Sequence, residues 1–374
     1  MNQAIRSLFP VTEKFIYFNH AAVSPLSTRV RDRMRALIDD VTQNGCVTYA
    51  GWLEAYDSTR ASAARLVNAR PREIAFMRNT SDAISAVANG IDWREGDTVV
   101  GCNVEFPANV YPWMRLAAER GVGLKQAPER EGRIDAGELL SLVDDRTRVV
   151  AISWVQFASG FRSDLARIGR FCRDRDIIFM VDAIQGLGGL RLDVERDFVD
   201  AFAADAHKYL LGPEGVALLY VSDRVIDRIK PTTVGWTSVK NYEQHLDYNL
   251  DYRDGALRFE CGTLNTVGVY GLGAAIDLFL EVGPETVEEH LLSLSDYLAE
   301  RLSAKGYSVV SSRRKGEASG IVTCTHERHS PGSLYHWLLS KNIITAPRAN
   351  RLRFSPHFYN TREEVDRLID ALPE

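Results

Sequence analysis

Paired cysteines are missing from this chain. Its 374 residues include five cysteines without a CxxC pair, at Cys46, Cys102, Cys172, Cys261 and Cys324. An odd, scattered set fits free thiols in a reducing compartment better than a disulfide framework or a zinc site. The segment "CTHERH" after Thr323 also lacks a clear fourth ligand, so we predict no metal centre.

Long apolar runs and an excess of one charge are also missing. No segment approaches the ~18–20 apolar residues of a membrane span, and the start, "MNQAIRSLFPVTEKF", lacks the apolar region of a signal peptide. Lys and Arg total 45 against 50 Asp and Glu, with a net charge of −5 and both signs spread along the chain. We therefore expect a cytoplasmic protein that binds neither nucleic acid nor membrane.

A glycine fingerprint for dinucleotides is the third absence. The string "GLGG" at 186–189 follows an apolar run, but it lacks the GxGxxG spacing and an acidic residue at the right distance. A Rossmann-type NAD enzyme is therefore disfavoured.

What the chain does contain is an alternation of short apolar runs and helix-length amphipathic segments, up to about Val221. The predicted strands are "EIAFM", "DTVVGC", "VGLKQA", "RVVAISWV", "IIFMVDA", "DAFAADA" and "VALLYV". Several are apolar on both faces, as in a sheet that helices cover on both sides. The pattern predicts an α/β fold with a mostly parallel, doubly wound sheet that binds ligands at the carboxyl ends of its strands.

The pattern changes after Val221. Residues 232–255 are polar and aromatic without a clear period, and a long apolar helix is predicted over 266–283. The rest alternates helices and strands over about 110 residues, within the usual size of a domain. We expect a large domain over 15–255 and a smaller C-terminal α/β domain over 256–374, which the N-terminal segment 1–14 joins.

Two successive strands end in groups of opposite charge. Asp182 ends "IIFMVDA" and Lys208 follows "DAFAADA". Alone, such an Asp most often caps a turn and such a Lys is most often a solvated charge. Because the carboxyl ends of parallel strands meet at one edge, the pair is expected in one crevice. Pyridoxal phosphate (PLP) uses this combination, a lysine for a Schiff base and an acid at its ring nitrogen.

Two more features favour the same cofactor. Thr80 and Ser81 start a predicted helix, where backbone N–H groups and the helix dipole favour a phosphate, although "NTSD" alone is an ordinary N-cap. Phe106 follows the strand "DTVVGC" and could cover a ring face, although alone it would more often be a core residue.

On these motifs the chain resembles class V aminotransferase-fold PLP enzymes, the group of cysteine desulfurases, kynureninases and isopenicillin N epimerase-like proteins. The resemblance follows the chain in order through "YFNHAAVSPLS", "RNTSDAI", "EFPANVYPW", "SWVQFASG", "VDAIQG", "DAHKYLLGPEG", "VGWTSV", "RFECGTLNT" and "RLRFSPHFYNTREEVDRL". It implies PLP transferase fold type I, a homodimer with shared active sites, PLP as the cofactor and an amino-acid substrate.

The resemblance also implies roles around the cofactor ring. Lys208 would form the Schiff base and then act as the base and acid at Cα. Asp182 would pair with the pyridine nitrogen, Gln185 would reach the phenolic oxygen, and Phe106 would stack on the ring.

The phosphate and substrate contacts follow from the resemblance too. Thr80, Ser81 and His207 would hold the phosphate, with Thr263 arriving from the partner subunit. The remaining positions would face the substrate: Arg353 on its α-carboxylate, and Asn19, His20 and Ala21 on the N-terminal loop.

Three positions depart from the family. Ser340–Ser355 has no cysteine where desulfurases carry their catalytic one, and Phe106 replaces the usual histidine. Asp205 replaces a phosphate-binding serine, and because an ionised carboxylate would repel phosphate, we expect it to face elsewhere, toward an Arg or backbone donors. The role of Gln156 stays open.

These departures favour C–S β-lyase elimination on an L-amino acid or a related metabolite. A transaminase or Cα epimerase of the isopenicillin N epimerase-like type is the alternative, and a non-catalytic PLP-fold binding protein is the second. Arg348 and Arg351 could serve a second acidic group on the substrate, or could simply be solvent-exposed.

Overall fold

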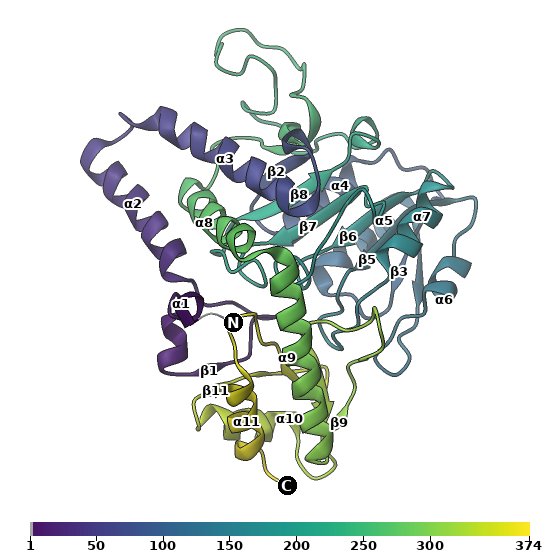
Figure 1. Ribbon diagram of the computed structural model, residues 1–374. Helices are drawn as coiled ribbons and strands as arrows, with labels where there is room; N and C mark the ends of the chain where they lie inside the picture. Colours follow the sequence, from purple (N-terminus) through teal and green to yellow (C-terminus); the bar gives the residue numbers. More distant parts are fainter. Residues whose placement is uncertain (1–2) are drawn as a thin grey trace.

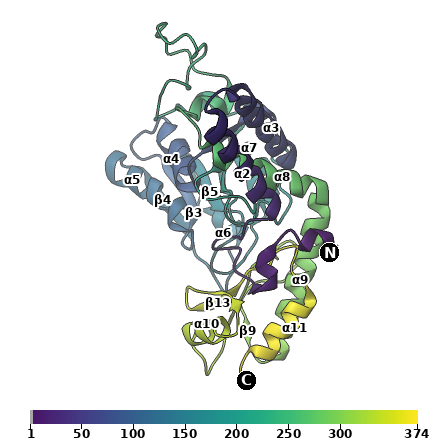
Figure 2. The ribbon, with the colours of Figure 1, turned by 90° about the vertical axis from the view of Figure 1, so that its left-hand side faces the viewer.

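A seven-stranded sheet forms the centre of the larger of two lobes in the computed structural model, which describes residues 3–374 (Figures 1 and 2). Its order is β2-β8-β7-β6-β5-β3-β4. The strands are β2 (Ile74–Met77), β3 (Thr98–Cys102), β4 (Gly123–Ala127), β5 (Thr147–Ser153), β6 (Ile178–Asp182), β7 (Ala201–Asp205) and β8 (Ala217–Val221). β8 runs antiparallel to both β2 and β7, and the other pairings are parallel. The predicted mostly parallel sheet and its seven strands are confirmed.

Helices cover both faces of this sheet. Alternate residues of β7 enter different cores: Phe202 and Ala204 pack on one side, Ala201 and Ala203 on the other. The first side is covered by α3 (Tyr49–Val67), α6 (Ala136–Ser141), α7 (Leu165–Arg173) and α8 (Thr266–Val282), and the second by α4 (Thr80–Gly90) and α5 (Tyr111–Arg120). This two-residue alternation between buried faces is why the strands are apolar throughout.

The smaller lobe holds a four-stranded antiparallel sheet of order β12-β13-β10-β9. Its strands are β9 (Ser308–Val309), β10 (Val322–Thr325), β12 (Ala346–Arg348) and β13 (Arg351–Phe354), and its helices are α9 (Pro284–Ala304), α10 (Pro331–Leu339) and α11 (Arg362–Ala371). β1 (Ile16–Tyr17) pairs in parallel with β11 (Ile343–Ile344). The other helices are α1 (Gln3–Arg6), α2 (Thr28–Asn44) and the 3-10 turns Pro10–Glu13, Pro71–Glu73, Pro107–Asn109, Ile226–Arg228 and Gly255–Phe259.

The packing of α8 and of β1 favours domain limits that differ from the expected ones. Val269, Leu272 and Ile276 of α8 lie in the large-domain core, whereas Ile16 and Phe18 lie in the small-domain core. We therefore propose a boundary near the α8–α9 junction, and a small domain that includes β1. Residues 1–2 of the expected N-terminal segment lie outside the described residues.

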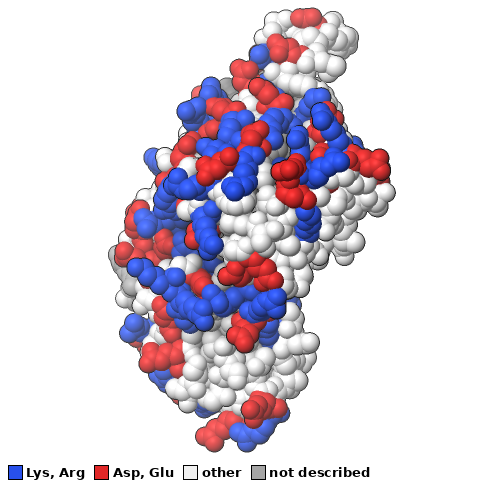
Figure 3. Space-filling view, turned by 90° about the vertical axis from the view of Figure 1, so that its right-hand side faces the viewer, with Lys and Arg blue, Asp and Glu red and all other residues white. Residues whose placement is uncertain are grey.

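Residues 232–255 have little regular structure, as expected, and their outer part projects from the large lobe at the top of Figure 1. Its tip exposes Leu246 and Tyr248, each 87% accessible. Over residues 3–374 no single helix is long and apolar enough to cross a membrane; α8 and α9 pass that test only as a pair bent by 83°. Figure 3 shows basic and acidic side chains interspersed on the face at the right of Figure 1.

Candidate active site

Neighbouring strands bring Asp182 and Lys208 to one edge of the large sheet. Asp182 is the last residue of β6 and pairs with Ala203 of β7, and Lys208 lies just past the end of β7. Both side chains are buried, with 1% and 7% of their surfaces accessible. The expected charge pair is therefore present at the carboxyl ends of parallel strands.

Burial changes the proton affinity of the Lys208 amine. Burial lowers the pKa of Lys208 to about 8, with Asp182 opposing the shift and Arg353 adding to it. A buried amine with this pKa is partly neutral near pH 7 and can accept a proton. Its Nζ lies 5.2 Å from the centroid of the Phe106 ring.

Asp182 keeps one oxygen unused. Its Oδ1 accepts a hydrogen bond of 3.1 Å from the Ile184 N–H, whereas Oδ2 is buried with no partner among the described residues. Burial raises the pKa of Asp182 to about 7. A protonated ring nitrogen beside Oδ2 would supply both a donor and a positive charge, and would return the carboxyl to its ionised form.

Unpartnered buried polar atoms gather on the residues expected around the cofactor. On those residues and their neighbours they are Asn19 Oδ1, Asp182 Oδ2, Gln185 Oε1, Gln156 Oε1, Asp205 Oδ1, His207 Nδ1, and Arg353 Nε and Nη2; the other unpartnered buried atoms belong to Arg60, Arg173, Tyr209, Ser222, Thr345 and Arg351. Each such group costs about 1–3 kcal/mol when it stays unpaired. Donors and acceptors of this kind, beside a buried lysine, fit a bound PLP and an anionic substrate.

The N-terminal loop reaches this group through its backbone. Gln185 Nε2 donates to Ala21 O at 3.1 Å, and Asn19 forms a bridge with Ser355. The His20 ring is already engaged, with Nδ1 2.8 Å from Ser355 O and Nε2 2.7 Å from the Tyr359 hydroxyl. Substrate contact by Asn19, His20 and Ala21 stays a prediction, and for His20 the ring nitrogens are occupied.

The first turn of α4 is held by Asp205. The Thr80 N–H donates to Asp205 Oδ2 at 3.1 Å, and the Asp205 N–H donates to Thr80 Oγ1 at 3.0 Å. The side chain of Asp205 thus faces the expected phosphate position. That corrects the expectation that it turns away, although its partner is a backbone donor as foreseen. Ser81 is exposed and His207 half-buried.

Arg353 lies on β13 and is 1% accessible. Its Nη1 donates to Phe157 O at 3.0 Å, and burial lowers its pKa to about 10, so the guanidinium stays charged at neutral pH. Nε and Nη2 remain free for a carboxylate. Arg351 pairs with Glu129 at 2.8 Å through Nη2, although its Nη1 is buried without a partner among the described residues, and exposed Arg348 donates to Pro347 O.

Glu105 is a site residue that the sequence reasoning missed. This buried carboxylate accepts hydrogen bonds from Ser153 N (2.9 Å), Gln156 Nε2 (2.9 Å), Asn109 Nδ2 (3.0 Å) and Cys102 Sγ (3.0 Å). It fixes Gln156 and the backbone that carries Phe106. An acid just past β3, at the same sheet edge as Asp182, was the available signal.

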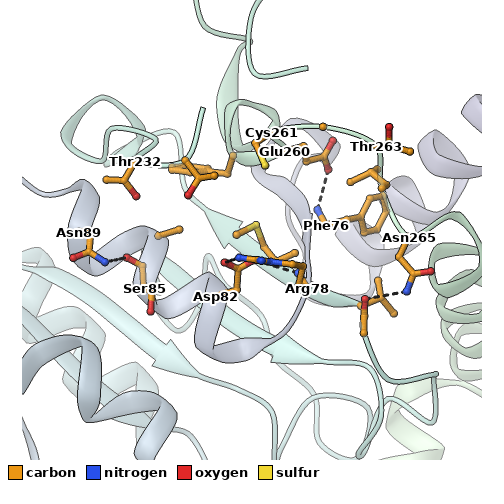
Figure 4. Close-up of a pocket in the computed structure, with 18 of the residues that line it drawn as sticks. Phe76, Arg78, Asp82, Ser85, Asn89, Thr232, Glu260, Cys261, Thr263 and Asn265 are labelled. Atoms are coloured by element: carbon orange, nitrogen blue, oxygen red, sulfur yellow. Dashed lines mark hydrogen bonds and ion pairs between the residues drawn. The ribbon is translucent and has the colours of Figure 1, made fainter. Parts of the chain in front are cut away.

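Thr263 borders a cavity whose lining includes neither Lys208 nor Asp182. It is exposed and lines this cavity, of about 590 Å³, on the outer side of α4, with Arg78, Asp82, Ser85 and Asn265 among the other lining residues (Figure 4). Arg78 and Asp82 point toward each other there, with Nη2 and Oδ1 2.7 Å apart. A phosphate contact by Thr263 from a partner subunit stays a prediction.

Comparisons with known proteins agree with this geometry. The model of the aminotransferase class-V family matches residues 16–368. A probable cysteine desulfurase of Methanothermobacter thermautotrophicus is 30% identical over 99% of this chain and 97% of its own, and an uncharacterized aminotransferase of Bacillus subtilis is 28% identical over 98% and 96%.

Solved structures show the same fold. The cystine C–S lyase C-DES, in complex with its product cysteine persulfide, superposes with a TM-score of 0.89 and 25% identity, over 98% of this chain and 100% of that one. The apo cysteine desulfurase of Thermococcus onnurineus gives 0.89 and 24%, over 99% and 96%. With its buried Lys208 and Asp182, the chain belongs to the class V aminotransferase family and is a PLP-dependent enzyme.

Proposed function

We propose that this enzyme is a C–S β-lyase that acts on an L-cysteine derivative. The observation that carries the proposal is the tight turn before Arg353. Arg348 pairs with Arg351 across a two-residue hairpin, in which Ala349 and Asn350 have φ values of 46° and 59°. Such a turn matches a type I′ hairpin and leaves no loop that could carry a catalytic cysteine to the substrate.

Of the five thiols, Cys102, Cys172 and Cys324 are buried, whereas Cys46 and Cys261 are exposed but lie outside the turn before Arg353. Cys324 lies on β10, pairs with Leu352 and is fully buried, and burial raises its pKa to about 12. Cys102 donates to Glu105, and burial raises its pKa well above the usual value. Since nucleophilic attack needs a thiolate, transfer of sulfur to an enzyme cysteine by the desulfurase route is not supported.

The residues present are sufficient for elimination. PLP, when bound, withdraws electrons from the substrate and so stabilises negative charge at Cα. Lys208 would hold the cofactor, Asp182 and Gln185 would contact its ring, and Thr80 and His207 its phosphate.

The proton and the leaving group can be followed by atom. Arg353 binds the substrate α-carboxylate through Nε and Nη2, which fixes Cα near the Lys208 amine. The amine takes the Cα proton, the Cβ–S bond breaks, and the sulfur leaves with its electron pair. Thiol pKa values lie near ~8.5, so the sulfur can leave as a thiolate with little help from a proton donor. Phe106, which cannot donate a proton, is therefore compatible with this reaction. Water converts the released enamine to pyruvate and ammonia.

We also propose a homodimer. Large apolar side chains are exposed at the junction of α2 and α3 and on the projecting 232–255 segment, at Val41, Val47, Tyr49, Trp236, Leu246, Tyr248 and Leu250. Exposed apolar groups in such numbers favour burial against another chain. Sedimentation of the purified protein tests this directly, and a monomer at all concentrations would contradict it.

The reaction is tested on the purified holoenzyme with L-cysteine, L-cystine, an S-alkyl-L-cysteine and L-alanine. We expect equal amounts of pyruvate and sulfur product from the sulfur substrates and neither from alanine. Loss of Cα chirality without pyruvate would instead indicate an epimerase, and a keto acid that retains the side chain, formed with conversion of the cofactor to its amine form, a transaminase. A protein that neither is yellow nor takes up PLP would contradict the whole assignment.

A further inference from the structure

Asp205 places a carboxylate at the end of the helix that faces the cofactor's phosphate. It lies three residues before Lys208, and its Oδ2 accepts the Thr80 N–H in the first turn of α4, which has 11 residues. Its backbone N–H donates to Thr80 Oγ1, so two bonds fix its position. The helix dipole makes this end attractive to an anion, and one anionic group already occupies it.

The other carboxyl oxygen has no partner. Asp205 is 6% accessible, and Oδ1 is buried without a hydrogen bond among the described residues. His207 Nδ1, two residues along, is also unpartnered. Oδ1 is therefore available either as a charged acceptor, which repels a phosphate, or as a protonated donor, which binds one.

The choice between these forms follows from charge. A phosphate monoester has its second pKa near ~6, so it is a dianion at neutral pH. An ionised Asp205 beside that dianion, away from water, would strongly oppose its binding, whereas a neutral carboxylic acid would donate one hydrogen bond to it. Burial already raises the pKa of Asp205 in the absence of any phosphate.

The charged groups around Asp205 are Lys208 and His207 on its own loop and Asp182 on neighbouring β6. Glu214, in the turn that leads to β8, acts on His207. α4 presents only the neutral Thr80 to this side chain. Lys208, and His207 when it is protonated, favour an ionised Asp205, but burial lowers the pKa of His207, so this imidazole is mostly neutral at pH 7 and above. Asp182 and the incoming dianion both oppose ionisation of Asp205.

We propose that Asp205 binds the cofactor's phosphate as a neutral carboxylic acid, so that binding takes up one proton and weakens as the pH rises. Oδ2 then accepts from Thr80 while the proton on Oδ1 is shared with a phosphate oxygen. The inference rests on PLP as the cofactor and is independent of which reaction the enzyme catalyses.

The test uses apoenzyme and 4′-deoxypyridoxine 5′-phosphate, which has the ring and the phosphate but no aldehyde to join Lys208. We expect its Kd to rise by up to about tenfold per pH unit above the pKa of Asp205 in the apoenzyme, because the binding form of Asp205 is depleted there. Calorimetry in buffers of different ionisation enthalpy should detect about one proton taken up per phosphate ligand bound. Unphosphorylated 4′-deoxypyridoxine is the matched ligand, and it reports any contribution from Asp182 at the ring nitrogen.

Variants assign the proton to one residue. Asp205→Asn supplies a permanent donor of the same shape, so it should bind the phosphate compound as tightly as wild type at low pH and lose the pH slope. Asp205→Ser should do the same, which guards against misfolding of one variant. Asp82→Asn is the matched control, since it removes a carboxylate from the same helix turn outside the cradle, and it should keep the slope.

Three results would overturn the proposal: a wild-type Kd that does not change with pH, an equal slope for both phosphorylated and unphosphorylated ligands, or an unchanged slope in Asp205→Asn. If His207→Gln alone removes the slope, the proton belongs to the imidazole and the proposal is wrong.

Discussion

The residues around Lys208 and the cavity beside α4 differ in how their polar groups are satisfied. The cavity of about 590 Å³ is lined by pairs that neutralise each other, such as Arg78 with Asp82 at 2.7 Å. Around Lys208, by contrast, buried atoms of Asp182, Gln185 and Arg353 have no partner among the described residues. Unpaired buried groups raise the free energy of the ligand-free protein, and a ligand that supplies the missing hydrogen bonds lowers it again. Empty volume alone is therefore a poor guide to where this enzyme works.

The largest effect is expected from Lys208→Ala, which removes the base and the point of attachment. We predict a loss of at least about 10³-fold in kcat, since general-base contributions alone reach ~10²–10⁴-fold. The yellow absorbance that borohydride removes in wild type should also disappear. Lys14→Ala, at an exposed position, is the control and should retain both.

Arg353→Lys should lower kcat/KM by about 10²-fold, mainly through KM, because an ammonium cannot bind a carboxylate in the two-donor geometry of Nε and Nη2. Arg115→Lys makes the same exchange at the cavity beside α4. It should leave both constants within about twofold. Equal losses in the two variants, measured by steady-state kinetics, would remove the distinction between the two regions.

The depressed pKa of Lys208 gives a pH test. Only the neutral amine attacks an aldehyde, and burial shifts its pKa down to about 8. The rate at which apoenzyme captures pyridoxal should therefore rise about tenfold per pH unit up to about pH 8 and then level off. Stopped-flow absorbance measures it, and pyridoxal lacks the phosphate that Asp205 would sense. A rise that continues to about pH 10 would show an ordinary, solvated lysine.

The smallest effect is expected in the cavity itself. Arg78→Gln breaks an ion pair whose arginine is 79% accessible. It should change the free energy of unfolding by no more than about 0.5 kcal/mol, as measured by urea denaturation. A loss of several kcal/mol would mean that the Arg78–Asp82 pair stabilises the fold. The proposed difference between the cavity beside α4 and the residues around Lys208 would then not hold.

Much of this arrangement could be predicted because it follows from topology. Apolar runs of β length identify the strands, and parallel strands bring their last residues to one edge, so Asp182 and Lys208 followed from their positions alone. The place of α8 did not follow, because an apolar helix packs equally well on either core, and only tertiary contacts assign it to α2 and α3.

The finer contacts also needed coordinates. Asp205 was expected to avoid the phosphate position on charge grounds, but the Thr80 N–H donates to its Oδ2 and fixes the side chain there. For Glu105 the sequence offered only its position just past β3, because the five groups that bond it are spread from Cys102 to Gln156 and meet only in the folded chain.

The pairing of β1 with β11 means that the chain passes between the lobes twice, once after β1 and once at the α8–α9 junction. These two segments are the covalent connections between the lobes. The first connection, which follows β1, is bonded to the loop that carries Lys208. Ser24 N donates to His207 O at 2.7 Å, and Ser24 Oγ donates to Lys208 O at 2.5 Å. A displacement of the small domain, which carries Arg353, would therefore be transmitted through Ser24 to the backbone of Lys208.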